Sequence, residues 1–426
     1  WIAPSEMIID NEIIESAEES EAETQLKQQM REELKQFLKP TGKVVAVITR
    51  KWKPLTGSLL PPKFQATNTN ASQAVLFLPS DRRMPRVRIR TRQASNLMDK
   101  IIVVGIDQWP SHSNYPLGHF IKELGPCGDK ETESEALLLQ YDIPYHPFSE
   151  NVLACLPTMP WTINEEDRKA RADFRDLNIV SIDPVGCTDI DDALHIRVLE
   201  NGHYEVGVHI ADVTHFVRSN TAIDTEAAAR GNTVYLVDKR IDMLPKLLGE
   251  NLCSLRSNVE RFAFSVIWEL DPESLEIIHT RFTKSIIRSR ESFTYGEAQS
   301  RIDDPAMNDD ITVSLRLLNK VAKTFRQRRM DRGALTLASP EVRFKRSEES
   351  NDPVDGPELY EMKETNALVE EFMLLANTSV AKKIYQHFPH VALLRRHPAP
   401  PKVNFETLAR VAKLKNISLD VTTSKL

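Results

Sequence analysis

Residues 183–195 read DPVGCTDIDDALH and place four aspartates, Asp183, Asp189, Asp191 and Asp192, within ten residues of one another. Two carboxylates about 4 Å apart repel each other by roughly 4 kcal/mol at an effective dielectric constant near 20, so a fold does not gather them for stability. Mg²⁺ and Mn²⁺ prefer oxygen ligands and commonly also take oxygens from a substrate phosphate. We therefore predict that these four aspartates bind divalent metal and that the site acts on phosphate groups.

The acidic cluster fits an EF-hand or a solvated turn less well. An EF-hand loop beginning at Asp189 would need glycine where Leu194 stands, and its fifth and seventh positions would fall on Ala193 and His195. A solvated acidic turn is the commoner case. Here, however, the cluster leads into an alternating apolar stretch at 193–198, which a turn and a second alternating stretch follow, and this pattern predicts a buried β-hairpin. Carboxylates at the edge of such a hairpin favour the metal site.

Composition indicates an ordinary globular protein. The 426 residues are enough for two or three domains of ~100 to 200 residues each. A hydrophobic content of 41% and a charged content of 27% are typical of soluble proteins. We find no apolar run long enough for a membrane span and no signal peptide at the start, WIAPSEMIIDNEII, so we expect an intracellular protein without a membrane partner. The sequence contains no CxxC motif, which indicates reduced, structural cysteines rather than zinc ligands or a disulfide framework.

The net charge of −6 does not by itself exclude nucleic-acid binding. Part of the negative charge belongs to the predicted metal ligands, and another part is concentrated at residues 12–23. Local positive charge is therefore the better indicator, because Lys and Arg contacts with phosphate dominate nucleic-acid affinity.

The N-terminal part of the chain predicts a connecting helix and then a small β-barrel. Apolar residues at helical spacing between residues 26 and 38 indicate an amphipathic helix that ends at Pro40. Short alternating strands are expected at 43–49, 73–79, 86–91 and 101–107, and a loop region at 118–147. Closely spaced short strands favour an OB-type barrel.

One predicted barrel strand is rich in arginine. The stretch RRMPRVRIRTR alternates apolar or small residues with Arg86, Arg88, Arg90 and Arg92. Because side chains alternate across a strand, these arginines should share one face, where they could bind the backbone of single-stranded nucleic acid. A solvated barrel face remains the alternative.

The C-terminal part predicts a mixed α+β domain. We expect a helix over 161–177, with Thr162 or Asn164 as its N-cap, that leads into the strand delivering Asp183. Further strands are expected at 262–270 and 277–290. Helices are expected at 224–230, around Glu297, at 311–329 and at 364–388.

Several motifs resemble one known family. The strings DPVGCTDIDDALH, VGVHIADVTHFV, ARGNTVYL, RIDMLPKLL and LCSLR resemble the catalytic domain of the RNase II (RNB) family of 3′ to 5′ exoribonucleases. The later strings RGALTLASPEVRF, LVEEFMLLANTSVAKKI and LLRRHPAPP resemble its eukaryotic branch, and most closely the hydrolytic catalytic subunit of the RNA exosome. The matching motifs run from about Gly42 to Pro401, so the resemblance covers most of the chain.

The resemblance implies a domain plan. We expect an α+β multidomain chain, incomplete at both ends. Its parts would be the tail of a preceding OB-type domain and a linker helix at 1–40, a cold-shock OB-type RNA-binding domain at 41–150, and the N-terminal part of the RNB domain at 151–426. We expect residues 1–426 alone to show little nuclease activity, because family members continue into a second half of the catalytic domain.

The resemblance also implies residue roles. Asp183, Asp189 and Asp192 would organise two Mg²⁺ (or Mn²⁺) ions and the substrate, while Asp191 would be the catalytic position whose loss stops cleavage but leaves RNA binding. Tyr235 and Tyr295 would contact the 3′-terminal nucleotides, although core tyrosines are the commoner case.

Two further candidates carry open alternatives. Glu371 or its neighbour Glu370 would lie near the terminal ribose, and the sequence does not separate them. Arg395, Arg396 and His397 are candidate phosphate contacts, with a solvated basic turn as the alternative.

The implied function is hydrolysis of single-stranded RNA from its 3′ end, with release of 5′-nucleoside monophosphates. The expected partners are single-stranded RNA and the core ring proteins of the RNA exosome, and the expected location is the nucleus and nucleolus and also the cytoplasm. Two rivals remain: an exosome-independent cytoplasmic relative, and a catalytically silent RNA-binding scaffold of the same fold.

Overall fold

The computed structural model describes residues 43, 45–49, 52–61, 72–236, 239–334, 342–343, 358–359, 362–396, 398 and 400–421. The predicted connecting helix before Pro40 and the candidate His397 lie outside these residues. The chain forms two compact units, residues 1–142 and 143–426, each described by itself below.

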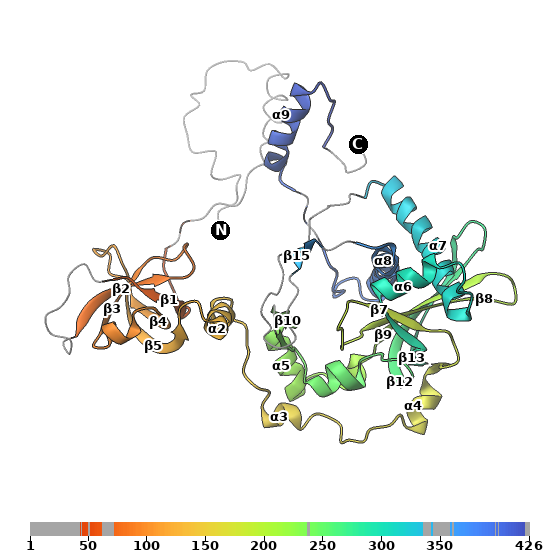
Figure 1. Cartoon of the computed structure of the whole chain (residues 1–426), viewed down its shortest axis with the longest axis horizontal. Coiled ribbons are helices and arrows are strands. Elements are labelled where there is room, and N and C mark those ends of the chain that lie inside the picture. Colours follow the sequence, from red (N-terminus) through yellow and green to blue (C-terminus); the bar gives the residue numbers. More distant parts are fainter. Residues whose placement is uncertain are drawn as a thin grey trace, which may run out of the picture. The chain divides into compact units, whose positions relative to one another are not determined.

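The first unit contains a closed five-stranded barrel with strand order β1-β2-β3-β5-β4, which confirms the predicted OB-type barrel (Figure 1). Its strands are β1 (Leu55–Leu59), β2 (Gln73–Pro79), β3 (Val87–Thr91), β4 (Lys100–Gln108) and β5 (Leu117–Pro126). Strands β3 and β5 pair in parallel, and the other neighbours pair antiparallel. Phe77, Val87 and Ile102 are fully buried in the barrel core.

Two expectations about the barrel were wrong. The described residues 43 and 45–49 form no strand, and Val45 and Ile48 are almost completely exposed. The first barrel strand is instead β1, whose glycine and serine weaken the apolar alternation on which the prediction relied. The predicted loop at 118–147 contains β5 and helix α2 (Lys130–Gln140), which Asp129 caps by accepting a hydrogen bond from the backbone of Thr132.

The second unit is built on a seven-stranded sheet of order β14-β7-β8-β9-β12-β13-β6. The strands are β6 (Ala172–Phe174), β7 (Val180–Asp183), β8 (Asp192–Val198), β9 (Tyr204–Ala211), β12 (Glu260–Leu270), β13 (Ile277–Arg288) and β14 (Glu291–Thr294). The two outer pairs, β14 with β7 and β6 with β13, are parallel, and the inner pairs are antiparallel. The predicted hairpin after the acidic cluster is therefore present as β8 and β9.

The remaining elements of this unit are short strands and helices. They are α3 (Glu150–Leu153), α4 (Glu165–Ala170), α5 (Ala222–Arg230), β10 (Val234–Tyr235), β11 (Arg240–Ile241), a π-helix (Leu247–Leu252), α6 (Tyr295–Asp303), α7 (Asp310–Asp331), β15 (Val342–Arg343), β16 (Glu358–Leu359), α8 (Glu364–His387) and α9 (Glu406–Leu414). The expected helices at 224–230, around Glu297, at 311–329 and at 364–388 are confirmed as α5 to α8. None of the described helices is both long and apolar enough to cross a membrane.

Helix α4 is shorter than predicted. Asn164, one of the two predicted caps, accepts a hydrogen bond from the backbone of Asp167, but the helix ends at Ala170. Residues 172–174 instead pair in parallel with β13, and the buried side chain of Arg171 forms an ion pair of 2.7 Å with Asp212. Tertiary contacts therefore override the helical pattern beyond Ala170.

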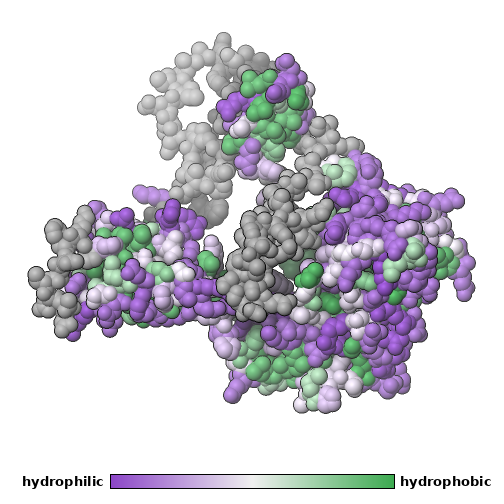
Figure 2. Space-filling view, in the orientation of Figure 1, coloured by the Kyte–Doolittle hydropathy of each residue, from purple (hydrophilic) through white to green (hydrophobic). Residues whose placement is uncertain are grey.

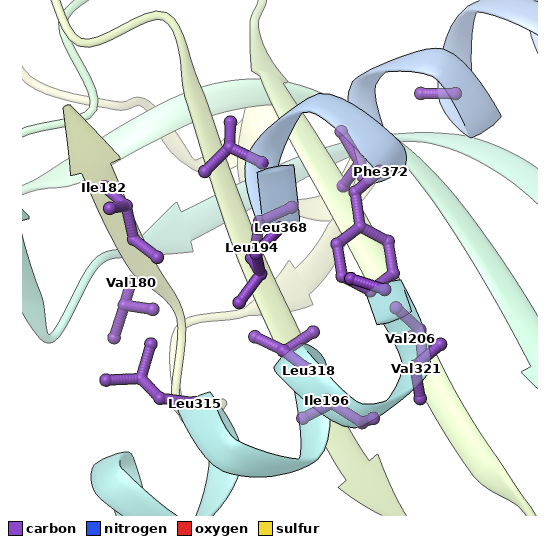
Figure 3. Packing of buried hydrophobic residues seen from close by; sticks show 14 of the residues in the cluster. Val180, Ile182, Leu194, Ile196, Val206, Leu315, Leu318, Val321, Leu368 and Phe372 are labelled. Atoms are coloured by element: carbon purple, nitrogen blue, oxygen red, sulfur yellow. The ribbon is translucent and has the colours of Figure 1, made fainter. Parts of the chain in front are cut away.

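Helices α6, α7 and α8 cover one face of the sheet (Figure 1). Figure 3 shows Leu194 of β8 facing Leu315 and Leu318 of α7 and Leu368 and Phe372 of α8. All five side chains are at most 1% exposed. The surface in the region of α7 and β8 is mostly hydrophilic (Figure 2), as expected for a helix that buries only one side.

The opposite face of the sheet contains a buried polar network. The imidazole nitrogens of His195 and His209 lie 2.8 Å apart, and His209 also bonds the hydroxyl of Ser265 at 2.7 Å. Glu205 borders His195 and pairs with Arg197 at 2.7 Å and Arg281 at 2.8 Å. Burial lowers the pKa of both histidines, so they are neutral near pH 7.

Strand β14 leads directly into helix α6. Thr294, the last residue of β14, pairs with Asp183 in the parallel register and also caps the helix. Its hydroxyl accepts a hydrogen bond from the backbone of Glu297, and the Glu297 carboxylate accepts one from the backbone of Thr294. Tyr295, the first helical residue, is thereby held beside the end of β7.

Candidate active site

The four aspartates lie at one end of the sheet, on the connection between β7 and β8. Asp183 ends β7, Asp192 begins β8, and Asp189 and Asp191 lie between them. Gly186, with a φ of 80°, makes the turn that returns the chain.

The backbone of this connection is fixed by long-range hydrogen bonds. The hydroxyl of Ser254 accepts from the backbone of Ile190 at 3.1 Å and donates to the carbonyl of Thr188 at 2.8 Å. The backbone of Leu255 donates to the carbonyl of Ile190, and that of Ala211 to the carbonyl of Asp191. The stretch LCSLR therefore fixes the backbone of the acidic loop by hydrogen bonds.

The aspartates border a cavity of about 850 Å³. Its lining also includes both predicted RNA-contacting tyrosines, Tyr235 and Tyr295. Six of the residues that the sequence singled out, although separated by up to 112 positions, therefore meet in one place; they are Asp183, Asp189, Asp191, Asp192, Tyr235 and Tyr295.

Electrostatics at the cluster favour a cation. Burial, together with the neighbouring Asp183 and Asp191, raises the pKa of Asp192 to about 7. Burial likewise raises the pKa of Asp183, and partial desolvation that of Asp191. No group among the described residues donates a hydrogen bond to the buried Oδ2 atom of Asp183. A divalent cation would remove the like-charge repulsion and satisfy this oxygen, so the donor set fits Mg²⁺ or Mn²⁺.

The predicted two-metal site nevertheless stays a prediction. In the part of the chain that the structure describes, no group of three or more His, Cys, Asp and Glu side chains has the arrangement of a complete metal site.

Sequence reasoning missed the partners of Asp189. The Tyr235 hydroxyl donates to its Oδ2 at 3.1 Å, and Nη1 of Arg240 pairs with its Oδ1 at 2.7 Å. Arg240 also pairs with Asp242 and Glu250. The motif string RIDMLPKLL, which begins at Arg240 and follows Tyr235 closely, was the available signal.

Comparison with protein-family models agrees with this geometry. Residues 171–426 match the RNB domain, and residues 74–142 match the Dis3-like cold-shock domain 2. The chain belongs to the RNB-domain family. The OB-type barrel is thus the cold-shock domain, and the cavity of the four aspartates lies in the RNB domain.

Sequence identity to individual proteins shows which members of the family the chain resembles. It is 54% identical over 425 residues to the exosome complex exonuclease RRP44 of Mus musculus, covering all of this chain and 44% of that protein. It is 55% identical over 393 residues to the exosome complex exonuclease dis3 of Schizosaccharomyces pombe, covering 91% of this chain and 40% of that protein. Identity to the DIS3-like exonuclease 2 of S. pombe is 39% over 412 residues, covering 90% of this chain and 44% of that protein. The chain therefore spans less than half the length of these relatives.

A solved structure has the same fold as this chain. RNase R of Mycoplasma genitalium, solved in complex with double-stranded RNA, aligns with a TM-score of 0.74 at 22% identity, covering 90% of this chain and 67% of that one.

Within the RNB domain, Glu371 lies away from the aspartates. Its side chain is 4% exposed and pairs with Arg329 at 2.5 Å, beside a separate cavity of about 490 Å³ that Phe325 also lines. Glu370 is half exposed and reaches the same arginine at 3.2 Å. The structure thus separates the two glutamates by burial but does not bring Glu371 into the aspartate cavity, and its role near RNA stays a prediction.

In the cold-shock domain, the arginine alternation is confirmed. Val87 and Ile89 are buried in the barrel core, and the alternating positions Arg86, Arg88, Arg90 and Arg92 are all exposed. Arg88 and Arg90 therefore lie on the outer face of β3, and the exposed Arg86 and Arg92 directly flank the strand. Their contact with RNA stays a prediction. Arg395 and Arg396 are also exposed.

Proposed function

We propose that the protein containing this chain is a 3′ to 5′ exoribonuclease that hydrolyses single-stranded RNA and releases 5′-nucleoside monophosphates. The observation that carries the proposal is the convergence of four aspartates and two tyrosines on one cavity of an RNB domain. Carboxylates and aromatic rings are the two kinds of group that this reaction needs, the first to hold metal and the second to hold nucleotides.

The aspartates Asp183, Asp189, Asp191 and Asp192 would hold Mg²⁺, with Mn²⁺ as an alternative, in a two-metal site. Such ions lower the pKa of a bound water and stabilise the attacking and leaving oxygens of the phosphodiester. The Ser254 hydrogen bonds and the β8–β9 hairpin fix the backbone that carries these carboxylates.

The two tyrosines would orient the 3′ end of the RNA. Tyr235 is 68% exposed, so its ring is available to a base, while its hydroxyl is fixed by Asp189. Stacking of a base on an aromatic ring contributes ~1 to 3 kcal/mol and does not depend on the base, which suits an enzyme that removes successive nucleotides. The arginine face of the cold-shock domain would bind the RNA backbone.

The RNA exosome is the proposed setting. The chain is 54% identical to a relative named as an exosome complex exonuclease and 39% identical to a DIS3-like exonuclease 2, which favours the exosome subunit over the exosome-independent relative. Its partners would then be the exosome core ring proteins, in the nucleus and nucleolus and in the cytoplasm. Co-purification of the full-length protein with ring proteins tests this part.

The catalytic assignment is tested with Asp191→Asn in the full-length protein. We expect 3′-end degradation to stop while the Kd for single-stranded RNA changes by no more than a few fold, because lost metal geometry acts on the transition state whereas affinity comes mainly from phosphate and base contacts. Asp176→Asn is the matched control, since Asp176 is almost fully exposed and lies outside the cavity.

Three results would contradict the assignment. Equal loss of binding and cleavage in Asp191→Asn would refute the role of Asp191. A wild-type protein that binds RNA but never releases nucleotides would favour the silent scaffold. Products other than 5′-nucleoside monophosphates would refute the proposed reaction.

A further inference from the structure

Arg240 lies at the edge of the aspartate cavity and pairs with several carboxylates. Its guanidinium contacts three carboxylates from three separate segments: Nη1 lies 2.7 Å from Asp189, Nε 2.5 Å from Asp242 and Nη2 2.6 Å from Glu250. Only 18% of the Arg240 side chain is exposed. All three of its nitrogen atoms are therefore engaged, so Arg240 is not a spare positive charge for the RNA backbone.

The contact with Asp189 matters because the Arg240 guanidinium makes the shortest hydrogen bond to this carboxylate, at 2.7 Å. The neighbouring backbone is held at Thr188 and Ile190 by Ser254, but these bonds do not reach the Asp189 side chain. The carboxylate is held by Arg240 on Oδ1 and by the Tyr235 hydroxyl on Oδ2, and the Cys187 thiol donates a longer hydrogen bond of 3.8 Å to Oδ1. Arg240 and Tyr235 therefore make the two short contacts that orient the Asp189 carboxylate.

The same contacts link an aspartate of the site to one of its tyrosines. Tyr235 and Arg240 pair with each other across the short β10–β11 ribbon, and both bond Asp189. Asp242 and Glu250 hold the guanidinium from the other side. A chain of contacts thus runs from the proposed nucleotide-binding ring through Asp189 and Arg240 to the π-helix that carries Glu250.

We propose that Arg240 is a positioning residue, which ties Asp189 to Asp242 and Glu250 and so sets the orientation in which Asp189 meets the divalent cation. The inference rests on the proposed function, because it concerns one of the carboxylates assigned there to the metal. Arginine is required at this position since its planar fork presents donors in fixed directions to several carboxylates at once, whereas a lysine ammonium is a single point of charge on a flexible stem.

The charge-preserving variant Arg240→Lys separates orientation from charge. Loss of a hydrogen-bonding partner behind a metal ligand typically costs ~10- to 100-fold in metal affinity or activity. We therefore expect Arg240→Lys to weaken Mn²⁺ binding by ~10- to 100-fold and to lower kcat by a similar factor. The Kd for RNA in EDTA should stay within about threefold, because the phosphate contacts that dominate RNA affinity do not involve Arg240.

The experiment uses the full-length protein. Mn²⁺ binding is measured without RNA by electron paramagnetic resonance of the free ion, and degradation of a single-stranded RNA is measured in single turnover. Arg256→Lys is the matched control, because Arg256 is exposed and bonds Asn251 rather than a carboxylate of the cavity. Glu250→Gln is the second variant: it leaves Arg240 in place and removes one of its three anchors, so it should lower Mn²⁺ affinity in the same direction but by less.

The outcomes distinguish this inference from the proposed function. If the wild-type protein binds Mn²⁺ and degrades RNA while Arg240→Lys does both equally well, the positioning role is refuted. If Arg240→Lys loses its thermal unfolding transition, Glu250→Gln decides, and unchanged Mn²⁺ affinity in that variant refutes the inference. If the wild-type protein itself neither binds Mn²⁺ nor degrades RNA, it is the proposed function that fails.

Discussion

Replacement of Glu205 by glutamine should destabilise the RNB domain in a strictly pH-dependent way. Glu205 lies on β9 with its side chain 8% exposed, and it pairs with Arg197, Arg281 and His195. Burial on its own would raise the pKa of this carboxyl, but the nearby His195 imidazole and the hydrogen bond from Arg197 outweigh it and lower the pKa from 4.5 to about 2. At about 1.4 kcal/mol for each pKa unit, ionised Glu205 stabilises the folded state by about 3 kcal/mol.

The sign of the pH dependence follows from the lowered pKa. The unfolded chain protonates Glu205 near pH 4.5 and the folded protein only near pH 2, so the stabilisation is fully present above pH 4.5 and disappears as the pH falls toward 2. Glutamine resembles the protonated acid. The difference in unfolding free energy between wild type and Glu205→Gln should therefore be about 3 kcal/mol at pH 7, shrink below pH 4.5 and approach zero near pH 2.

Urea unfolding of both proteins between pH 2 and pH 7, followed by circular dichroism, measures this difference. Glu200→Gln, at the exposed turn of the same hairpin, controls for the loss of one negative charge and should show no such trend. A difference that stays constant with pH would mean that Glu205 contributes by packing alone. A difference below about 0.5 kcal/mol at pH 7 would mean that the two partly exposed arginines gain as much from water as from Glu205.

Three further predictions concern the two domains. Replacing both Arg88 and Arg90 by alanine in the cold-shock domain should weaken single-stranded RNA binding and flatten the plot of log K against log salt by up to ~0.7 for each phosphate that the variant no longer binds; an unchanged slope in a folded variant would mean a merely solvated face. Phe372→Ala should lower the unfolding free energy by ~3 to 5 kcal/mol in denaturant titrations, because this fully buried ring packs between the sheet and the helices. Gly207→Ala should cost ~1 to 3 kcal/mol, since the added Cβ would lie 2.3 Å from the His195 ring; a neutral effect in the same titration would show that the imidazole moves aside.

Periodic patterns in the sequence predicted most of the RNB sheet and its helices. The β8–β9 hairpin, β12, β13 and helices α6 to α8 all have clear apolar alternation or helical spacing. The patterns failed where pairing rather than composition decides the structure. Residues 172–174 become β6 only because β13 offers a parallel edge, and β1 is recognisable only once its neighbours β2 and β4 are in place.

For a similar reason, the sequence revealed the aspartates of the site but not the partners that hold them. Four aspartates within ten residues are visible in any sequence because repulsion makes such a cluster costly without a cation. Arg240 could not be found in this way, since nothing local to it shows that it pairs with a carboxylate 51 positions earlier. The resemblance to a family supplied Tyr235 and Tyr295, whose spacing in the sequence is uninformative.

The direct junction between β14 and α6 restricts where the RNB domain can accept inserted residues. Tyr295 follows Thr294, which pairs with Asp183 in the sheet and also caps helix α6. One residue inserted between them would therefore turn Tyr295 by about 100° around the helix axis and move it along the axis by about 1.5 Å. The tyrosine would then leave the cavity although every strand and helix survived. The exposed β8–β9 turn, where Gly202 has a φ of 85°, is under no such restriction and can lengthen freely. Evolutionary insertions and engineered tags should therefore be found or tolerated at that turn, whereas the β14–α6 junction should keep a constant length in every relative that still uses this tyrosine.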